Sequence, residues 1–280
     1  MRHDRVAVVT GASSGIGAET AVGIAKAGLD VVVIARDGDR LRETVQRIEA
    51  CGRSANALTA DFTSLADVRR VAATLLSDYP RIDVVVNNAG TVVPRRATTP
   101  DGYEKTFAVN QLAPYLLTRL LLTRLRECAP ARVVIVSSDA YKSGQLDLDD
   151  LMMDRKYKPL RAYSNSKLAN ALFAFELARR LDGTGVVANA LHPGVVRTDL
   201  ARDNKLWSIV WRYVVGSFAR SPERGARTPV YLATAPEAAN VSGKFFYDEK
   251  PIDVETKARD PQAARRLWEV CADLVGLPPE

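Results

Sequence analysis

The N-terminal part of the chain constrains the fold most strongly, because an apolar run ends at a glycine-rich turn that opens a helical segment. Val6–Thr10 is short and continuously apolar, which predicts a buried parallel strand. The residues that follow read Gly-Ala-Ser-Ser-Gly-Ile-Gly, and 16–28 is rich in alanine with apolar residues at helical spacing. Gly28 is a typical helix stop signal. The segment therefore predicts a strand, a tight turn and a helix.

The same alternation continues along the chain. Strands are predicted at 31–35, 55–60, 82–87, 133–137, 186–191 and 245–247, and helices at 41–51, 65–79, 103–125 and 162–181. The helix at 103–125 is expected to bend near Asn110 and Pro114. Alternating strands and helices predict an α/β fold with a doubly wound parallel sheet, Rossmann-like, with helices on both faces. We expect a single domain over 1–280, because no repeat, low-complexity tract or linker divides the chain.

Composition and charge narrow the function classes. Apolar residues make up 47% of the chain and the formal net charge is +6, which is typical of a globular protein with an anionic partner. The basic residues are scattered and form no tract, so we expect no nucleic-acid partner. A phosphorylated small molecule explains the charge more simply.

Cysteine and histidine usage disfavours disulfides and metals. Cys51, Cys128 and Cys271 form no CxxC pair, which favours a reducing, cytoplasmic compartment. His3 and His192 are the only histidines, so a histidine-based metal site is not expected. No apolar region of a secretory signal precedes the first strand, and no apolar run is long enough to span a bilayer.

The glycine-rich turn predicts a phosphate-binding site. Its glycines allow a tight turn and a close approach of the backbone, and the following helix offers free N–H groups and a favourable dipole. Ser13 or Ser14 could add a hydroxyl. The spacing is G-x-x-x-G-x-G, which differs from the general G-x-G-x-x-G fingerprint, and a simple turn is the alternative. The predicted contacts are Gly11, Ser13, Ser14, Gly15, Ile16 and Gly17.

Tyr163 and Lys167 form a candidate catalytic pair. Their spacing of four residues places the phenol and the ammonium on one face of a helix. A neighbouring cation favours the phenolate and lowers the pKa of a tyrosine, which would allow proton transfer near neutral pH. Among nine tyrosines, only Tyr163 has a lysine at this spacing. A pair of side chains on the surface of a helix, without a catalytic role, is the alternative.

Four motifs in order resemble the short-chain dehydrogenase/reductase family. They are the T-G-x-x-x-G-I-G turn, Asn87-Asn88-Ala89-Gly90, Ser137-Ser138 and the Tyr163/Lys167 pair, and the resemblance runs from Val6 to about Asp248. Finer details resemble the retinol-dehydrogenase-like branch. These lie at 35–37, 163–170 and 191–198, and in the stretch from 221–223 to 241–244.

The resemblance implies a catalytic group of four residues. Tyr163 would be the general acid or base, and Lys167 would lower its pKa and bind the nicotinamide ribose. Ser138 would hydrogen-bond the substrate oxygen. Asn110 would hold a water that links Lys167 to solvent. Alternatively, Ser138 simply ends a strand and Asn110 is a polar residue at a helix bend.

Arg36 favours NADP(H) as the cofactor. In this fold class, an acidic residue after the second strand binds the adenosine ribose, whereas an arginine accommodates a 2′-phosphate. Arg36 is the first residue after the predicted strand 31–35. Asp37 follows and could face the ribose, so NAD(H) stays open.

The resemblance supplies the remaining cofactor contacts. Asp61 would touch the adenine amino group, although capping of the next helix, which Ser64 could also do, is the alternative. His192 is expected to be structural, and Asn88 to stabilise the sheet. Further residues would line the adenine, its ribose and the nicotinamide carboxamide: Phe62, Asn87, Ala89, Gly90, Pro193, Gly194, Val196 and Thr198.

Two segments suggest the substrate and partners. Residues 206–218 combine aromatic and aliphatic residues with arginines, so we interpret 198–222 as a lid over a pocket for a lipophilic carbonyl or alcohol. Packing on the core is the alternative, and peripheral membrane contact through 206–218 is a further expectation. The longer segment 145–153 is interpreted as a flap, with a surface excursion as the alternative.

The C-terminal segment 260–277 predicts a helix that docks on its own chain or on a partner. The helix that carries Tyr163 has a second apolar side at Leu172 and Phe175. Because relatives often pair through this helix, a homodimer is one expected assembly.

Together these features predict an NADP(H)-dependent oxidoreductase that interconverts a lipophilic carbonyl compound and its alcohol, with tyrosine as general acid/base. One alternative is a catalytically silent dinucleotide-binding sensor or scaffold. Another is a nucleotide-sugar epimerase or dehydratase, for which the chain is short.

Overall fold

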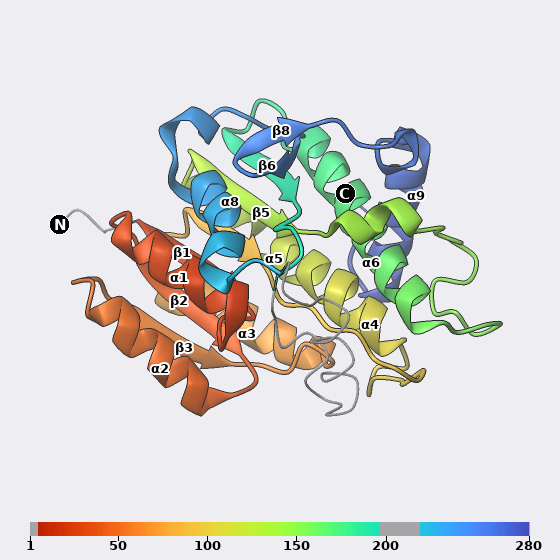
Figure 1. The fold of residues 1–280 in the computed structure, drawn as a ribbon, viewed down its shortest axis with the longest axis horizontal. Helices are drawn as coiled ribbons and strands as arrows, with labels where there is room; N and C mark the ends of the chain where they lie inside the picture. The colour runs from red at the N-terminus through yellow and green to blue at the C-terminus, as the bar shows by residue number, and fades with distance from the viewer. Residues whose placement is uncertain (1–4, 197–218, 280) are drawn as a thin grey trace.

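A single eight-stranded sheet organises the described part of the chain, residues 5–196 and 219–279 of the computed structural model (Figure 1). The strand order is β3-β2-β1-β4-β5-β6-β7-β8. All pairs are parallel except β7 with β8, which is antiparallel. The strands are β1 Val6–Thr10, β2 Asp30–Ala35, β3 Ala55–Thr59, β4 Val84–Asn87, β5 Ala131–Val136, β6 Val186–Leu191, β7 Phe245–Tyr247 and β8 Lys250–Ile252.

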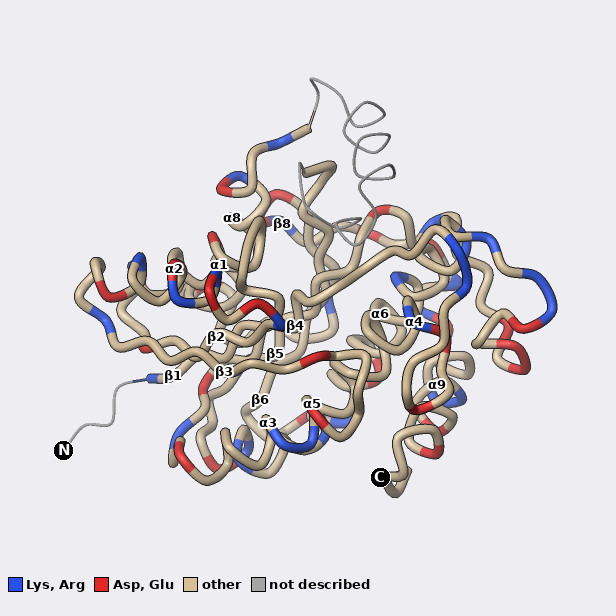
Figure 2. The backbone as a smooth tube through the Cα atoms, turned by 90° about the horizontal axis from the view of Figure 1, so that it is seen from below, with Lys and Arg blue, Asp and Glu red and all other residues tan. Residues whose placement is uncertain are grey.

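Helices cover both faces of this sheet, as Figure 2 shows in side view. One face carries α1 Gly15–Lys26, α2 Gly38–Glu49 and α8 Pro222–Thr234, whose apolar residues form one cluster with the strands. The other carries α3 Leu65–Asp78, α4 Lys105–Phe107, α5 Ala113–Glu127 and α6 Pro159–Arg180, with α9 Pro261–Leu274 packed on α6. Short helical turns lie at Ala108–Leu112, Asp139–Ser143, Pro236–Ala238 and Thr256–Ala258. The predicted doubly wound fold is confirmed.

Three local features differ from the prediction. The helix expected at 103–125 is interrupted by the π-helical turn Ala108–Leu112, which contains Asn110. Helix α8 was absent from the predicted elements, although Ser221 caps it and Pro222 occupies its first turn. Strand β8 was also missed, because three residues with a central proline carry no periodic signal.

The C-terminal helix α9 packs on its own chain. Trp268 is 2% exposed, and its ring centre lies 5.1 Å from that of Tyr115 and 5.9 Å from that of Phe173. Leu172, expected on a pairing surface, is 1% exposed and belongs to the same hydrophobic cluster. This apolar side of α6 is therefore satisfied within the chain, and a homodimer stays a prediction.

No helix in the described ranges combines the length and hydropathy needed to cross a bilayer. Acidic and basic residues are scattered over the described backbone, with long uncharged stretches between them (Figure 2).

Candidate active site

A large cleft opens at the carboxyl ends of the parallel strands, where ligands bind in doubly wound sheets. Its volume is about 1800 Å³. Most of the predicted site residues line it. They are Gly11, Ser13, Ser14, Gly15, Ile16, Gly17, Arg36, Asp61, Phe62, Ala89, Gly90, Ser138, Tyr163, Lys167, Pro193, Gly194 and Val196.

The glycine-rich turn leaves the start of α1 open towards this cleft. Gly11 and Gly15 have positive φ angles of 67° and 55°, which favour glycine. A Cβ on Gly17 would lie 2.2 Å from the carbonyl oxygen of Gly11, so the helix and the turn pack too closely for any side chain. Ser14 is the N-cap but makes no side-chain capping bond, and the first turn holds no acidic residue. The free N–H groups and the helix dipole therefore fit a pyrophosphate.

Asn88 ties the turn to the neighbouring strand end. Its Nδ2 donates to the carbonyl oxygen of Thr10 at 2.9 Å, and its backbone N–H donates to the Thr10 hydroxyl at 3.0 Å. The Thr10 hydroxyl in turn donates to the carbonyl oxygen of Val86. The expected role of Asn88 in holding the central sheet is confirmed, whereas Thr10 was missed.

The end of β2 separates the roles of Arg36 and Asp37. Asp37 is the N-cap of α2, where its carboxylate accepts from the backbone N–H of Arg40 and lies 3.6 Å from the Arg40 guanidinium. Arg36 is exposed on the wall of the cleft. The carboxylate of Asp37 is therefore engaged at the start of α2, whereas Arg36 faces the cleft.

Asp61 faces the cleft and does not cap α3. Ser64 is the N-cap of α3 and accepts from the backbone N–H of Asp67 at 3.3 Å. The Asp61 carboxylate accepts a hydrogen bond from the backbone N–H of Thr63 at 3.0 Å, and Asp61 lines the cleft. The capping alternative for Asp61 is therefore wrong.

Tyr163, Lys167 and Ser138 all line the cleft. Ser138 follows β5, and Tyr163 and Lys167 lie one turn apart on α6. The Ser137 hydroxyl donates to the carbonyl oxygen of Lys167 at 2.8 Å, which fixes α6 against the end of β5. The Lys167 ammonium lies 5.6 Å from the centre of the Tyr163 ring.

Burial dominates the pKa values of this pair. It raises the pKa of the Tyr163 phenol above 10.0, and the hydrogen bond with Ser138 lowers it only in part. Burial lowers the pKa of Lys167 from 10.5 to about 8. The Lys167 ammonium donates to the carbonyl oxygen of Val136 at 2.9 Å instead of to the phenol. The expectation that Lys167 lowers the pKa of Tyr163 is thus not met in this structure.

Asn110 lies behind the cleft and does not line it. It is 1% exposed, its Oδ1 accepts from the N–H of Thr91 at 2.7 Å, and its Nδ2 donates to the Ser166 hydroxyl at 2.9 Å. The Asn110 carbonyl oxygen, which belongs to the π-helical turn, accepts from Asn170 Nδ2 at 2.7 Å. Asn170 Oδ1 lies 3.4 Å from the Lys167 ammonium. Asn170, which sequence reasoning missed, therefore connects Asn110 to Lys167.

Three further predictions either differ from the structure or concern residues outside the described ranges. Asn87 is not part of the cleft lining, because its Nδ2 donates to the Thr118 hydroxyl at 2.8 Å and so points towards α5. Thr198 and the segment 206–218 lie outside the described residues, as does most of the expected lid at 198–222. Within 145–153, Gln145 lines the cleft, whereas Met152 contacts Arg96 and the N–H of Glu104, so most of this segment is a surface excursion.

The turn after β6 forms part of the cleft wall. His192 is buried, its ring stacks on Tyr247 at 4.2 Å with an interplanar angle of 4°, and its Nδ1 accepts from the N–H of Gly194 at 3.3 Å. Burial lowers the pKa of His192, which keeps the imidazole neutral. The structural role expected of His192 is confirmed, and Tyr247 is a lining residue that sequence reasoning missed.

A doubly wound sheet with an open glycine-rich turn, and a tyrosine, a serine and a lysine in one cleft, defines a dinucleotide-binding enzyme. Comparison with known proteins identifies the family within this class. The profile of the family described as short chain dehydrogenase matches residues 5–208. Retinol dehydrogenase 14 of Homo sapiens is 40% identical over 99% of this chain and 88% of its own length.

Solved structures agree with this assignment. A putative uncharacterised protein from Mycobacterium paratuberculosis superposes with a TM-score of 0.80 and 32% identity, over 99% of this chain and 95% of that one. The Pseudomonas aeruginosa RhlG/NADP active-site complex gives a TM-score of 0.69 and 30% identity, over 86% and 93%. The chain belongs to the short-chain dehydrogenase family. It is therefore an oxidoreductase of the class that acts on CH–OH groups with a nicotinamide dinucleotide.

Proposed function

We propose that this protein is an NADP(H)-dependent oxidoreductase that interconverts a lipophilic carbonyl compound and its alcohol, with Tyr163 as general acid/base. The observation that carries the proposal is that Ser138, Tyr163 and Lys167 line the same cleft as the open start of α1. The cofactor would supply the hydride, and the protein supplies its orientation and the proton.

Tyr163 is suited to donate a proton. Because burial raises its pKa, the phenol is protonated at neutral pH and can protonate a carbonyl oxygen as that oxygen gains charge. Ser138 hydrogen-bonds to Tyr163 and would hydrogen-bond to the same substrate oxygen. Lys167, anchored by the carbonyl oxygen of Val136, lies beside the phenol and would bind the nicotinamide ribose.

The cleft residues also fit the parts of the cofactor. The N–H groups at the start of α1 would bind the pyrophosphate, and Arg36 would bind the 2′-phosphate of NADP(H). Asp61 and Phe62 would contact the adenine, and the turn Pro193–Val196 would meet the nicotinamide end. The NADP complex of the Pseudomonas relative supports this choice of cofactor.

Apolar side chains exposed in the cleft support a lipophilic substrate. Among the described residues, Leu160 and Val195 are the large hydrophobic side chains that stand exposed, at 57% and 59%. Both line this cleft. Their apolar surface would be removed from water by a lipophilic substrate, and the retinol dehydrogenases among the relatives are named for such an alcohol. Peripheral membrane contact, a homodimer and a cytoplasmic location stay predictions.

The direct test is a screen of lipophilic aldehydes, ketones and steroids for oxidation of NADPH, repeated with NADH. Turnover with NADPH, and a raised KM for the lipophilic substrate in Leu160→Ser and Val195→Ser, would support the proposal. Binding of NADPH without turnover of any carbonyl or alcohol would favour the silent sensor instead.

A further inference from the structure

Arg220 lies behind the turn that follows β6 and contacts it through both backbone and side chain. Its backbone N–H donates to the carbonyl oxygen of Val195 at 2.8 Å, and Val196 and Arg220 form a parallel bridge. A Cβ on Gly194 would lie 3.0 Å from Cδ and Nε of Arg220, so the arginine side chain packs directly against the Gly194 backbone. Arg220 itself is not part of the cleft lining.

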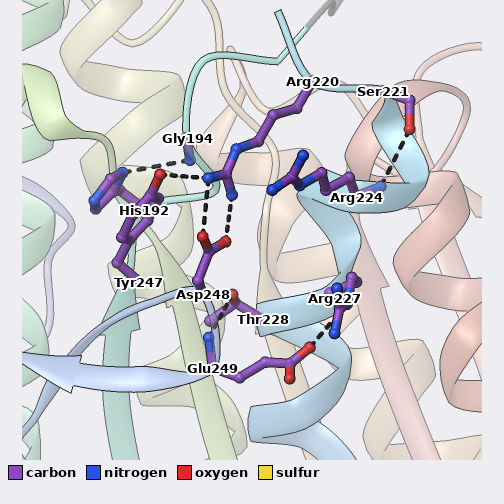
Figure 3. A network of polar contacts seen from close by, with 10 residues as sticks. All are labelled: His192, Gly194, Arg220, Ser221, Arg224, Arg227, Thr228, Tyr247, Asp248 and Glu249. Carbon is purple, nitrogen blue, oxygen red and sulfur yellow. Dashed lines mark hydrogen bonds and ion pairs between the residues drawn. The ribbon is translucent and has the colours of Figure 1, made fainter.

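The guanidinium of Arg220 is fixed by the β7–β8 hairpin, as Figure 3 shows. It forms a two-pronged ion pair with the carboxylate of Asp248 and donates to the hydroxyl of Tyr247. It also lies 4.8 Å from the centre of the Tyr247 ring. The Arg220 side chain is only 15% exposed, so this pair is partly shielded from solvent and from salt.

The hairpin loop adopts a conformation that its residues disfavour. Tyr247 pairs with Lys250, which leaves a two-residue loop. Both loop residues, Asp248 and Glu249, have positive φ, at 47° and 63°. Such loops favour Asn-Gly, because side chains are strained in the left-handed region. Strain of this kind persists where surrounding contacts hold it, and here the carboxylate of Asp248 meets Arg220.

The contacts continue from Arg220 to the cleft. Tyr247, held by Arg220, stacks on His192, and His192 accepts from the N–H of Gly194. The turn is therefore contacted at Gly194 by two side chains. The Arg220 side chain packs against the Gly194 backbone, and the His192 ring accepts a hydrogen bond from the Gly194 N–H (Figure 3). Both His192 and Tyr247 line the cleft.

We propose that Arg220 is a positioning residue, which through Asp248 and Tyr247 sets the Pro193–Val196 turn in the shape that receives the nicotinamide end of the cofactor. The inference rests on the proposed function, because it assumes that this turn meets the nicotinamide. It adds a residue outside the phosphate-binding turn whose loss is expected to affect only one end of the dinucleotide.

The test compares binding of NADP⁺ with binding of 2′-phospho-ADP-ribose, which lacks nicotinamide, by calorimetry on the full chain. Arg220→Ala should weaken NADP⁺ binding roughly tenfold, as expected for the loss of charge-assisted contacts, and leave the fragment unchanged. Arg220→Lys keeps the positive charge but not the two-pronged geometry of the guanidinium, so it should recover part of the lost affinity. If NADP⁺ binds no more tightly than NAD⁺, the pair NAD⁺ and ADP-ribose gives the same comparison.

Two further variants separate positioning from folding. The double substitution Asp248→Asn with Glu249→Gly relieves the loop strain, so thermal stability should not fall, yet it releases Arg220 and should weaken NADP⁺ binding as Arg220→Ala does. Arg227→Ala is the matched control, because Arg227 pairs with Glu249 at 3.1 Å, is 67% exposed and does not line the cleft. It should leave both affinities unchanged.

The outcomes are distinct. Equal weakening of NADP⁺ and the fragment, or no weakening of either, would overturn the role of Arg220 while the proposed function stands. A wild-type protein that binds neither full dinucleotide nor either fragment would overturn the proposed function, and with it this inference.

Discussion

The ammonium of Lys167 lies 5.6 Å from the centre of the Tyr163 ring and donates its hydrogen bond to the carbonyl oxygen of Val136. The two groups are therefore neighbours, but the hydrogen bonds of the ammonium go to other groups than the phenol. Burial acts on both, raising the pKa of the phenol and lowering the pKa of the ammonium. The neutral phenol is thus the favoured form near pH 7, which suits a proton donor in carbonyl reduction.

Lys167 should make the stability of the cofactor-free protein depend on pH. The unfolded chain keeps this ammonium up to its ordinary pKa of 10.5, whereas the folded chain releases the proton near pH 8. Between these values the unfolded state binds more protons, so the contribution of Lys167 to the free energy of unfolding rises with pH, by on the order of 3 kcal/mol. Below pH 8 Lys167 is charged in both states, so burying the ammonium lowers the free energy of unfolding by its full amount.

Urea unfolding of wild type and Lys167→Met across this range isolates the effect. Burial also raises the pKa of Tyr115 and Cys271 to about 12, which lowers stability at high pH in both proteins alike. Only the difference between the two proteins reports Lys167. A difference that stays constant from pH 7 to about 10.5 would show that the ammonium is not perturbed by burial.

Ser138 should set the pH dependence of alcohol oxidation. Because the hydrogen bond from Ser138 lowers the pKa of Tyr163, Ser138→Ala raises that pKa further. In the oxidation direction the phenolate is the base, so kcat/KM should rise with pH, and this rising limb of the profile should move to higher pH in the variant. We expect kcat to fall by roughly 10²–10³-fold, the range for loss of one oxyanion donor. An unchanged pH profile would mean that Ser138 does not act on Tyr163.

Arg36 should discriminate between the two nicotinamide dinucleotides. Arg36→Ala is expected to weaken NADPH binding by about 1.5–3 kcal/mol, the range for hydrogen bonds to charged groups, and to leave NADH binding nearly unchanged. Arg40→Ala is the matched control, since Arg40 follows closely, pairs with Asp37 and does not line the cleft. Isothermal titration of both cofactors decides the matter. Equal losses for NADPH and NADH would remove the phosphate role.

Trp268 should carry a large part of the stability of the C-terminal region. Its ring is buried against Tyr115 and Phe173, with the guanidinium groups of Arg119 and Arg180 at 4.9 Å and 4.4 Å. Trp268→Ala should lower the free energy of unfolding by about 3–5 kcal/mol. Leu160→Ala, at an exposed position, should change it by less than about 0.5 kcal/mol. Similar denaturation midpoints for the two variants would show that α9 is not part of the cooperative core.

The fold was predictable because its signals are local. Continuous valine runs such as 31–33 and the turn at Gly11–Gly17 each specify an element without reference to the rest of the chain. Helix α8 escaped because Gly225 and Pro229 interrupt its pattern, and its stability comes from packing on α1. Strand β8 depends on its pairing with β7, which no window of sequence reveals.

The sequence predicted most of the residues that line the site, but not their pKa shifts or all of their hydrogen-bond partners. The spacing of Tyr163 and Lys167 placed both in one cleft, but spacing does not give the depth of burial, which decides the direction of the pKa shift. The side chain of Asn87 points to the face of the sheet that carries α5. Side chains alternate between the two faces along a strand, so the register of the strand decides which face Asn87 meets. Asn170 acts through the carbonyl of a π-helical turn, and the bend expected near Asn110 did not specify which partner that carbonyl would meet.

The most direct test of the account is the turnover of a confirmed substrate by Tyr163→Phe, measured together with NADPH binding. The account predicts that NADPH binding stays nearly intact while kcat falls by roughly 10²–10⁴-fold, because the proton donor is removed and the cofactor contacts remain. Turnover at the wild-type rate, with NADPH bound, would contradict it.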